Sequence, residues 1–425
     1  MLTNLVIYAN LAILTLFFAA YAYQAFYLLV GLFKKEKALE PKGTPGRYAV
    51  LIPARNEEAV IDKLLESLEA QDYPAGLLDI YVIADNCTDG TAQRARMHQG
   101  VDVLERHSSR LVGKGYALDA ALAYLPRHNT GLPYDGYFVF DADNVLDPNF
   151  VKEMDRTFRS GYPVVTSYRN SKNYGSNWIS AGYALWFLRE SRFLNGARAK
   201  LGLNCAISGT GFLVSAKLLQ KAGGWKWHLL TEDIEFSVDN AIHHNAIGYC
   251  PRAVLYDEQP VCFGESWNQR LRWSKGFYQV VRRYGSRLAR GATQKKGFSC
   301  YDMLMTIAPA TLLTLAMLLF NGGALAYAVW AGKKYLFFLT LFEVTNTLLS
   351  IYCSLFLFGL ITTITEWSSI HCSGFKKLVY LFTFPVFILT YIPIAVAALR
   401  RNVTWKPIRH SIACSSQDIC AVRQK

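Results

Sequence analysis

The chain has long apolar blocks near both ends and a hydrophilic stretch with short apolar runs between them. The first block, residues 5–33, carries no charged side chain, and three more lie near residues 302–331, 335–364 and 378–399. A helix of about 20 apolar residues is long enough to cross a bilayer. Each block therefore predicts a helix that could span a membrane.

The first block is followed at once by Lys34, Lys35 and Lys37. It is too long for the core of a signal peptide and lacks a basic start, so residues 1–33 are predicted to form an uncleaved transmembrane anchor. Lysines gather on the cytoplasmic side of membrane helices. We therefore expect a multi-pass protein of the cell (plasma) membrane, with the region after the anchor in the cytoplasm.

The block at 378–399 is interrupted by Pro385 and Pro393. If every block within residues 301–400 crossed the membrane, the tail at 401–425 would lie outside the cell. The basic residues around its start favour the inside; they are Arg400, Arg401, Lys406 and Arg409. We therefore expect 378–399 to be an interfacial or re-entrant element, followed by a basic cytoplasmic tail.

Between the ends, residues 34–47 form a linker with Pro and Gly, and residues 48–264 are long enough for one domain. Apolar runs predict strands at 48–53, 80–84 and 137–140, and helical spacing predicts helices at 59–68 and 91–97. Strands that alternate with helices predict an α/β fold with a parallel sheet. Ligands of such sheets bind at the carboxyl ends of the strands.

A polar cluster follows each predicted strand. The clusters are Arg55-Asn56-Glu57-Glu58, Asp85-Asn86-Cys87-Thr88-Asp89-Gly90 and Asp141-Ala142-Asp143-Asn144. No GxGxxG motif follows the first strand, which disfavours a dinucleotide site, and Gly113-Lys114-Gly115 is a small basic loop but not a P-loop. Asp141 and Asp143 suit a hard divalent cation whose other ligands come from substrate phosphate, although Asp is also an ordinary turn residue.

Two further motifs lie downstream. Thr231-Glu232-Asp233 opens a predicted helix, where acids also simply complement the helix dipole, and 208–211 is expected to precede another helix. Gln269-Arg270-Leu271-Arg272-Trp273 lies in a basic amphipathic segment, 265–300, which also suits an interfacial helix on anionic lipid. In a helix Gln269, Arg272 and Trp273 share a face; Arg270 lies off it and is expected to tolerate substitution.

Composition supports a membrane protein. Of 425 residues, 52% are hydrophobic and 18% are charged, whereas about 25% are charged in an average soluble protein. The net charge of +13 could suit nucleic acid, anionic lipid or an anionic substrate, but basic residues beside membrane helices account for it without nucleic acid. Nine scattered cysteines without CxxC spacing fit a reduced compartment and give no thiolate metal site.

The order DxD, TED and QxxRW, framed by membrane helices, resembles the processive family 2 glycosyltransferases, which include cellulose, chitin, hyaluronan and poly-N-acetylglucosamine synthases. The resemblance covers residues 48–290 well and the membrane flanks in outline. It implies a GT-A fold and a UDP-sugar donor, UDP-N-acetylglucosamine or UDP-glucose. It also implies Mg²⁺ or Mn²⁺ and inverting transfer to a growing β-linked polysaccharide.

The resemblance also implies roles for single residues in the nucleotide half of the site. Glu57 and Asp85 are expected at the uridine, and Lys114 near the uracil or the diphosphate. Asp141 and Asp143 are expected to hold the nucleotide and the metal ion, with Asp143 as the direct ligand.

In the acceptor half, the resemblance makes Asp233 the general base, with Glu232 beside it. A second acid and hydrophobic cover raise the pKa of a carboxylate, which suits a base. Gln269, Arg272 and Trp273 are expected to close the acceptor end and the diphosphate.

One motif departs from the family pattern. The FxVTxK gating loop of cellulose synthases is absent from its usual place. Val403-Thr404-Trp405-Lys406 partly resembles that loop and partly the Trp-containing loop of hyaluronan synthases. The same residues could simply be a basic juxtamembrane tail.

Three functions remain open. QxxRW favours a processive polysaccharide synthase, whereas the small number of predicted spans favours a non-processive enzyme that adds one sugar to a lipid. A non-enzymatic protein that binds nucleic acid or anionic lipid is opposed by Asp141, Asp143 and Asp233. We therefore expect a polysaccharide or lipid acceptor, contact with membrane lipids and no nucleic acid; the sequence identifies no export partner.

Overall fold

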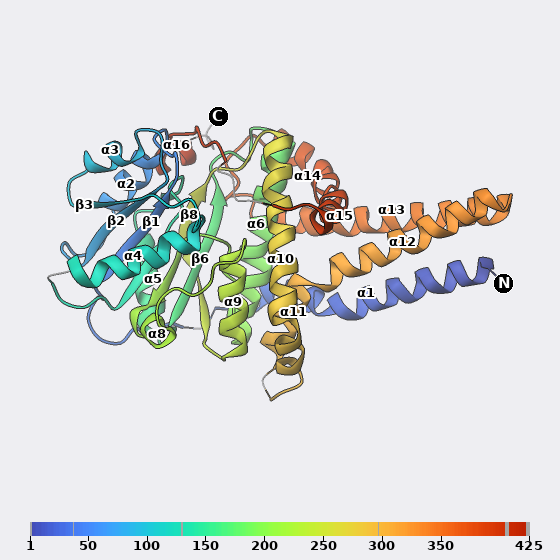
Figure 1. Ribbon diagram of the computed structural model, residues 1–425, viewed down its shortest axis with the longest axis horizontal. Coiled ribbons are helices and arrows are strands. Elements are labelled where there is room, and N and C mark those ends of the chain that lie inside the picture. The colour runs from blue at the N-terminus through green and yellow to red at the C-terminus, as the bar shows by residue number, and fades with distance from the viewer. Residues whose placement is uncertain (1, 37, 129–130, 296, 404–407, 422–425) are drawn as a thin grey trace.

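The computed structural model describes residues 2–36, 38–128, 131–295, 297–403 and 408–421. Its centre is an eight-stranded mixed sheet with strand order β3-β2-β1-β4-β7-β6-β8-β5 (Figure 1). The strands are β1 Tyr48–Ala54, β2 Leu78–Asp85, β3 Val101–Arg106, β4 Gly136–Val139, β5 Val145–Leu146, β6 Val164–Ser171, β7 Phe212–Ser215 and β8 Ile247–Asp257. All three predicted strands and the α/β class are confirmed.

The first half of the sheet is parallel and the second half is mixed. β1 pairs in parallel with β2 and β4, and β2 with β3. β7 runs antiparallel to both β4 and β6, while β6 and β8 are parallel. The predicted helix after 208–211 is wrong in one respect, because β7 comes before it.

Helices cover both faces of the sheet because side chains alternate along each strand. Val50 and Ile52 of β1 join the core beneath α2 Ile61–Glu69, α3 Thr91–Arg96 and α5 Phe150–Arg159. Ala49 and Leu51 face the other way. That second core lies beneath α4 Lys114–His128, α6 Trp178–Arg189, α8 Ala216–Ala222 and α9 Glu232–Ile242.

Two segments connect this domain to the apolar helices. A π-helix, Glu190–Asn195, continues α6 into α7 Gly196–Leu201. The long α10, Phe263–Ala292, then leads into α11 Phe298–Ile307. One face of α10 is buried along its length, including Arg270, Gly276 and Tyr284. The predicted segment 265–300 is thus helical as far as Ala292, and its placement at a membrane interface stays a prediction.

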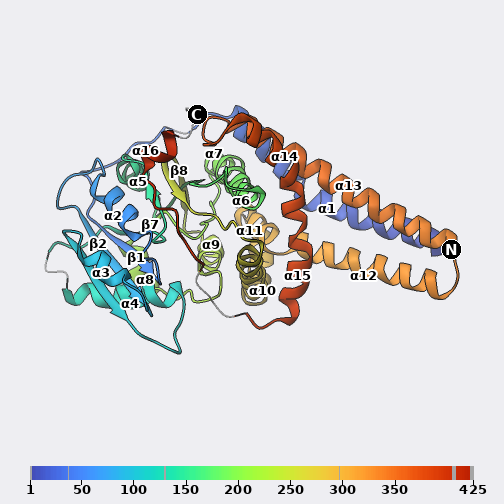
Figure 2. The same cartoon turned by 90° about the horizontal axis from the view of Figure 1, so that it is seen from above.

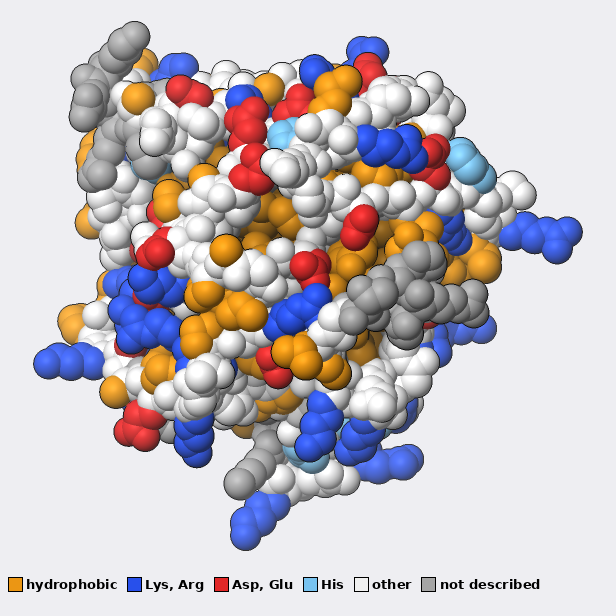
Figure 3. Space-filling model, turned by 90° about the vertical axis from the view of Figure 1, so that its left-hand side faces the viewer, with side chains coloured by type: hydrophobic (Ala, Val, Ile, Leu, Met, Phe, Trp, Pro, Cys, Tyr) orange, Lys and Arg blue, Asp and Glu red, His pale blue; other side chains and the backbone are white. Residues whose placement is uncertain are grey.

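Three apolar helices project together away from the domain (Figures 1 and 2). They are α1 Leu2–Phe33, α12 Pro309–Trp330 and α13 Lys334–Thr365. The side-chain amides of Asn10 in α1 and Asn321 in α12 bond each other in both directions, at 2.8 and 3.0 Å. The opposite face of the molecule mixes acidic and basic side chains (Figure 3).

The last apolar block stays beside the domain instead (Figure 2). It forms α14 Gly374–Leu389 and α15 Tyr391–Arg400, and is followed later by the short α16 Ser416–Ala421. Across the described residues, four helices are long and apolar enough to cross a membrane: Leu2–Phe33, Leu313–Trp330, Lys334–Thr365 and Gly374–Arg400. The expectation that 378–399 is interfacial or re-entrant stays a prediction.

Candidate active site

The loops after β1 and β2 brace each other at the carboxyl edge of the sheet. Asn56 and Asn86 both take positive φ, 59° and 55°, a conformation that Asn tolerates better than most residues. The backbone N–H of Thr88 donates to Asn56 Oδ1 at 2.8 Å, and the N–H of Glu57 donates to Thr91 Oγ1 at 2.9 Å. These bonds fix the two loops that carry Glu57 and Asp85.

Glu57 and Asp85, the expected uridine residues, are both paired in this structure. Asp85 is buried and forms a salt bridge with Arg106. Glu57 lies 2.9 Å from Nδ1 of His410. Burial raises the pKa of Glu57 to about 7, although His410 opposes the shift.

Asp141 and Lys114 meet over the loop after Ile207. Lys114 is the first residue of α4, and its Nζ contacts Asp141 Oδ1 and donates to the carbonyl of Gly209 at 2.7 Å. The N–H of Asp141 donates to Thr210 Oγ1 at 2.8 Å. The small basic loop, the DxD turn and the 208–211 loop are thereby held together.

Asp143 is buried at 5% exposure and accepts a 2.8 Å hydrogen bond from the N–H of Glu258. Burial works against its ionisation, but the charges of His410 and Lys172 and the Glu258 hydrogen bond lower its pKa. No group of three or more His, Cys, Asp or Glu side chains within the described ranges is placed to hold a metal ion. An ionised Asp143 and a partly exposed Asp141 therefore fit a cation only if substrate oxygens complete its shell.

Asp233 and Glu232 lie in the first turn of α9. Burial, followed by the charge of Asp233, raises the pKa of Glu232 to about 7. Burial also raises the pKa of Asp233, against the charges of Lys114 and Arg272. This pair thus has the electrostatic character expected of a base.

Gly209 shows how close the two acidic motifs are. A Cβ built on Gly209 would lie 3.8 Å from Oδ2 of Asp233 and 4.0 Å from Oδ2 of Asp141. Both carboxylates therefore border one small volume above the 208–211 loop. The TED and DxD motifs, about 90 residues apart in sequence, meet at this point.

Two glycines allow the surrounding segments to approach this closely. A Cβ on Gly115 would lie 2.4 Å from the carbonyl oxygen of Trp227, and one on Gly276 of α10 would lie 2.5 Å from Thr231. Such distances are well below van der Waals contact. Only glycine at these positions lets the Lys114 loop and α10 pack against the segment that leads into Glu232.

The QxxRW segment lies on α10 beside this pair. The charge of Arg272 acts on both Glu232 and Asp233, which places it near the proposed base. Trp273 packs edge-on against Tyr183, with ring centroids 5.7 Å apart, and against Phe187. Oε1 of Gln269 is buried without a hydrogen-bond partner among the described residues.

Arg270 contradicts the expectation that it tolerates substitution. Its side chain is fully buried, and Nη1 donates to the carbonyl of Phe387 at 3.1 Å and to Thr390 Oγ1 at 2.6 Å. Its guanidinium also lies 4.4 Å from the ring centroid of Phe387. The face that looked free on an isolated helix is the face on which α14 and α15 pack.

Residues 45–276 match the family described as "Glycosyltransferase like family 2". The chain belongs to this family. The family 2 domain shares 26% identity over 243 residues with the β-monoglucosyldiacylglycerol synthase of Synechocystis, covering 55% of this chain and 48% of that protein. It shares 26% over 246 residues with the poly-β-1,6-N-acetyl-D-glucosamine synthase of Staphylococcus epidermidis, covering 55% of each.

The chain thus spans about half the length of these two relatives. The solved mannosyltransferase PcManGT of Pyrobaculum calidifontis, described in complex with GDP-Man and Mn²⁺, superposes over 92% of this chain and 99% of its own. The TM-score is 0.59 at 19% identity, which supports the GT-A fold of the family 2 domain.

Several residues of this site were not predicted from the sequence. Arg169 of β6 donates to Asp257 Oδ2 and to the carbonyl of Ser208, both at 2.6 Å. Glu258 and His410 were missed as well. A charged residue at the end of a strand was the available signal for Asp257 and Glu258, but nothing in the sequence links His410 to them.

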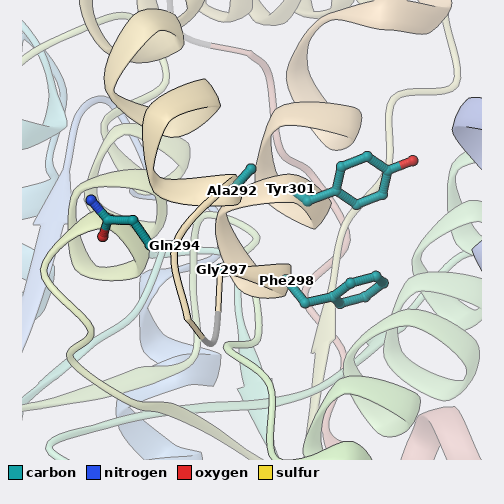
Figure 4. A pocket seen from close by; sticks show the side chains of 5 residues that line it. All are labelled: Ala292, Gln294, Gly297, Phe298 and Tyr301. Carbon is teal, nitrogen blue, oxygen red and sulfur yellow. The ribbon is translucent and has the colours of Figure 1, made fainter.

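Two hollows lie in the described part of the chain, and they differ in volume. One, of about 30 Å³, is lined by residues that include Lys114, Tyr116, His228 and Glu232, and the rings of Tyr116 and His228 stack at 4.3 Å. A larger one, of about 410 Å³, lies at the turn between α10 and α11 (Figure 4). The second is separate from the acidic motifs.

Thr404, Trp405 and Lys406 of the motif that resembles a gating loop lie outside the described residues.

Proposed function

We propose that the protein is a membrane-bound inverting glycosyltransferase that transfers a sugar from a UDP-sugar to a growing β-linked polysaccharide. UDP-N-acetylglucosamine and UDP-glucose are the proposed donors. The observation that carries the proposal is the convergence of Asp141 and Asp233 on Gly209. This convergence supports a site in which a cation-bound diphosphate and a base for an acceptor hydroxyl lie side by side.

In this proposal Asp233 takes the proton of the acceptor hydroxyl while its oxygen attacks the anomeric carbon of the sugar. The bond from that carbon to the diphosphate oxygen breaks, and the nucleoside diphosphate leaves from the opposite side. Asp141 and Asp143 would hold Mg²⁺ or Mn²⁺, which supplies positive charge for the leaving group. Lys114 and Arg272 add positive charge around the same volume.

A glycolipid product is the second candidate. Trp273 packs against α6, while Lys275 and Tyr278 of α10 donate to the α15 carbonyls of Ala398 and Ala395 at 3.1 and 3.0 Å. The acceptor side of the site is therefore next to an apolar helix pair along which a lipid hydroxyl could approach. The match to the β-monoglucosyldiacylglycerol synthase favours the same candidate.

We also propose that the domain divides as the sequence predicts and lies with its tail in the cytoplasm. The tail segment that begins after residue 407 hydrogen-bonds Glu57 and Glu258 of the catalytic domain. Domain and tail must then lie on one side of a membrane that α1, α12 and α13 cross. This supports the interfacial placement of residues 378–399.

Protein purified in detergent tests the proposal when it is offered UDP-N-acetylglucosamine, UDP-glucose and GDP-mannose with Mn²⁺. Release of UDP together with a ladder of oligosaccharides supports the polymer product. A single sugar on added diacylglycerol supports the glycolipid product. Turnover of GDP-mannose alone would refute the UDP-sugar assignment.

Asp233→Asn is the matched control for that experiment. A base acts in the transition state, so this variant should still bind UDP while transfer is lost. An equal loss of UDP affinity would make Asp233 a nucleotide-binding residue and not the base.

A further inference from the structure

The smaller of the two hollows adjoins both acidic motifs. It has a volume of about 30 Å³ and lies between the start of α4 and the segment that leads into α9. Residues 112–116 and 228–230 line it together with Glu232. Lys114, one of the lining residues, contacts Asp141, and Glu232 directly precedes Asp233. The hollow therefore opens beside the volume in which the proposed reaction takes place.

His228 brings unpartnered polar atoms to this hollow. Neither of its ring nitrogens makes a hydrogen bond with a residue in the described ranges, and Nδ1 is buried. One face of the ring is covered by Tyr116, so hydrogen bonds can form only at the ring edge, where both nitrogens lie. A buried polar atom without a partner costs free energy, and a ligand that pairs with the imidazole recovers it.

The wall that carries His228 is fixed from two sides. Its ring stacks on that of Tyr116, with centroids 4.3 Å apart and planes 2° from parallel. The N–H groups of the next two residues donate to Glu235 Oε2 at 3.0 Å and to Gln279 Oε1 of α10 at 3.3 Å. The hollow therefore keeps its size unless these contacts break.

The size of the hollow matches one hydroxyl group. A space of about 10–15 Å³ is enough for one water molecule, so about 30 Å³ accommodates a hydroxyl. An acetamido group adds a carbonyl and a methyl group, and it would have to displace the stacked rings. The two proposed donors differ by this substitution, because N-acetylglucosamine carries the acetamido group on the carbon where glucose carries its 2-hydroxyl.

The position of the hollow suits a substituent beside the anomeric carbon. In the proposed reaction the sugar lies between a diphosphate at Asp141 and the base Asp233. Carbon 2 is bonded directly to the anomeric carbon, so its substituent stays close to both of these groups. The hollow is reached from the same two places, through Lys114 and Glu232.

We infer that the hollow receives the 2-hydroxyl of the transferred sugar, that His228 hydrogen-bonds this hydroxyl, and that the protein therefore selects UDP-glucose over UDP-N-acetylglucosamine. The inference rests on the proposed function and chooses between its two donors. Because His228 touches the sugar and not the diphosphate, its loss should weaken binding of UDP-glucose and leave binding of UDP unchanged.

The test measures binding of four ligands to the full-length protein in detergent with Mn²⁺ and no added acceptor, by titration calorimetry. The ligands are UDP, UDP-glucose, UDP-2-deoxyglucose and UDP-N-acetylglucosamine. The wild type should bind UDP-glucose about tenfold more tightly than the 2-deoxy compound, as expected for one hydrogen bond. It should bind UDP-N-acetylglucosamine more weakly still, since the acetamido group does not fit.

In His228→Ala the affinities for UDP-glucose and UDP-2-deoxyglucose should become equal, because the partner of the 2-hydroxyl is gone. UDP-N-acetylglucosamine should bind more tightly than it does to the wild type, because the hollow is larger. His228→Gln keeps a donor and an acceptor and should restore part of the preference for UDP-glucose. Lys226→Ala is the matched control, since this half-exposed side chain belongs to the same segment; all four affinities should stay unchanged.

A wild type that binds UDP-N-acetylglucosamine as tightly as UDP-glucose would overturn the inference. So would equal losses of UDP and UDP-glucose affinity in His228→Ala, or a 2-deoxy effect that persists in this variant. If thermal unfolding shows that His228→Ala does not fold, the wild type and His228→Gln decide the question with the same ligands. A wild type that binds none of the four ligands would instead refute the proposed function, and the inference with it.

Discussion

The two neighbouring acids at the start of α9 set the pH range in which the site can accept a proton. Burial raises the pKa of both Glu232 and Asp233, and the charge of Asp233 contributes to the value of about 7 for Glu232. The two carboxyls titrate as a pair. A raised pKa means that the pair takes up a proton as the pH falls through this range.

We therefore predict that kcat/KM falls as the pH drops below about 7. Glu232→Gln removes one acid of the pair, so the acidic limb of its pH–rate profile should move to lower pH. The measurement is initial rate against pH for both proteins at saturating metal. If the acidic limb of Glu232→Gln does not move, the titration belongs to another group.

Asp143 is a second residue with a specific expectation. Its lowered pKa keeps it ionised near neutral pH, which a metal ligand requires. Asp143→Asn should therefore abolish transfer, and EDTA should abolish transfer by the wild type until Mg²⁺ or Mn²⁺ is restored. Asp102→Asn, at an exposed position on β3, should retain activity. Full turnover in EDTA would contradict the assignment of Asp143 as a metal ligand.

At the scale of single elements, α10 carries two arginines with different roles. Arg270 is fully buried and hydrogen-bonds the carbonyl of Phe387 in α14 and the hydroxyl of Thr390, the residue after α14. The positive charge of Arg272 instead acts to lower the pKa of Glu232 and Asp233. Removing a large buried side chain leaves a cavity and unpaired partners. The two substitutions should therefore fail in different assays.

We predict that Arg270→Ala lowers the unfolding temperature in detergent, consistent with a loss of about 2–4 kcal/mol. Arg272→Ala should keep the wild-type unfolding temperature while it loses transfer. Arg290→Ala, exposed near the end of α10, is the control for both. A stable Arg270→Ala would mean that α14 holds its place on α10 without this side chain.

The same elements show how far the sequence alone could lead. β1, β2 and β4 were predictable because each is a short apolar run that ends in polar residues, and the ends of parallel strands meet at one edge. The DxD motif around Asp141 was visible for the same reason, whereas the TED motif around Asp233 was visible as the start of a predicted helix and through the resemblance to the family. Arg270 was misjudged because helical periodicity shows faces but not which face a later helix will cover.

Pairing between distant segments was also hidden. β7 occupies the middle of the sheet although it is four residues long and follows 208–211 directly. His410 lies 353 residues from Glu57 along the chain, and no sequence pattern in either segment predicts the contact. Both depend on tertiary packing rather than on local preference.

At the scale of the whole molecule, one buried ion pair joins the catalytic domain to the apolar helices. Arg198 of α7 bonds both oxygens of Asp302 in α11, at 2.7 and 2.9 Å. The hydroxyls of Tyr23 and Tyr27 of α1 donate to the same carboxylate at 3.0 and 2.8 Å. Three segments are therefore tied to one fully buried acid.

We predict that Asp302→Asn lowers the unfolding temperature strongly, because loss of one partner from a buried pair costs about 3–5 kcal/mol. Asp72→Asn breaks the exposed pair with Lys152 and should change it little, since such pairs contribute about 0–1 kcal/mol. Thermal unfolding in detergent compares the two. Similar small shifts would show that the α1–α11 contact is held mainly by its aromatic packing.

The contact between His410 and Glu57 also has a consequence for the order of events during synthesis. Glu57 lies in the loop that directly follows the first strand to leave the ribosome, and His410 emerges only after the described apolar helices have been made. A chain that stalls before this point can build the sheet, both acidic motifs and the helices. It lacks His410, however, and so cannot form the contact with Glu57. The final contact thus forms only in chains whose translation has passed the membrane segments.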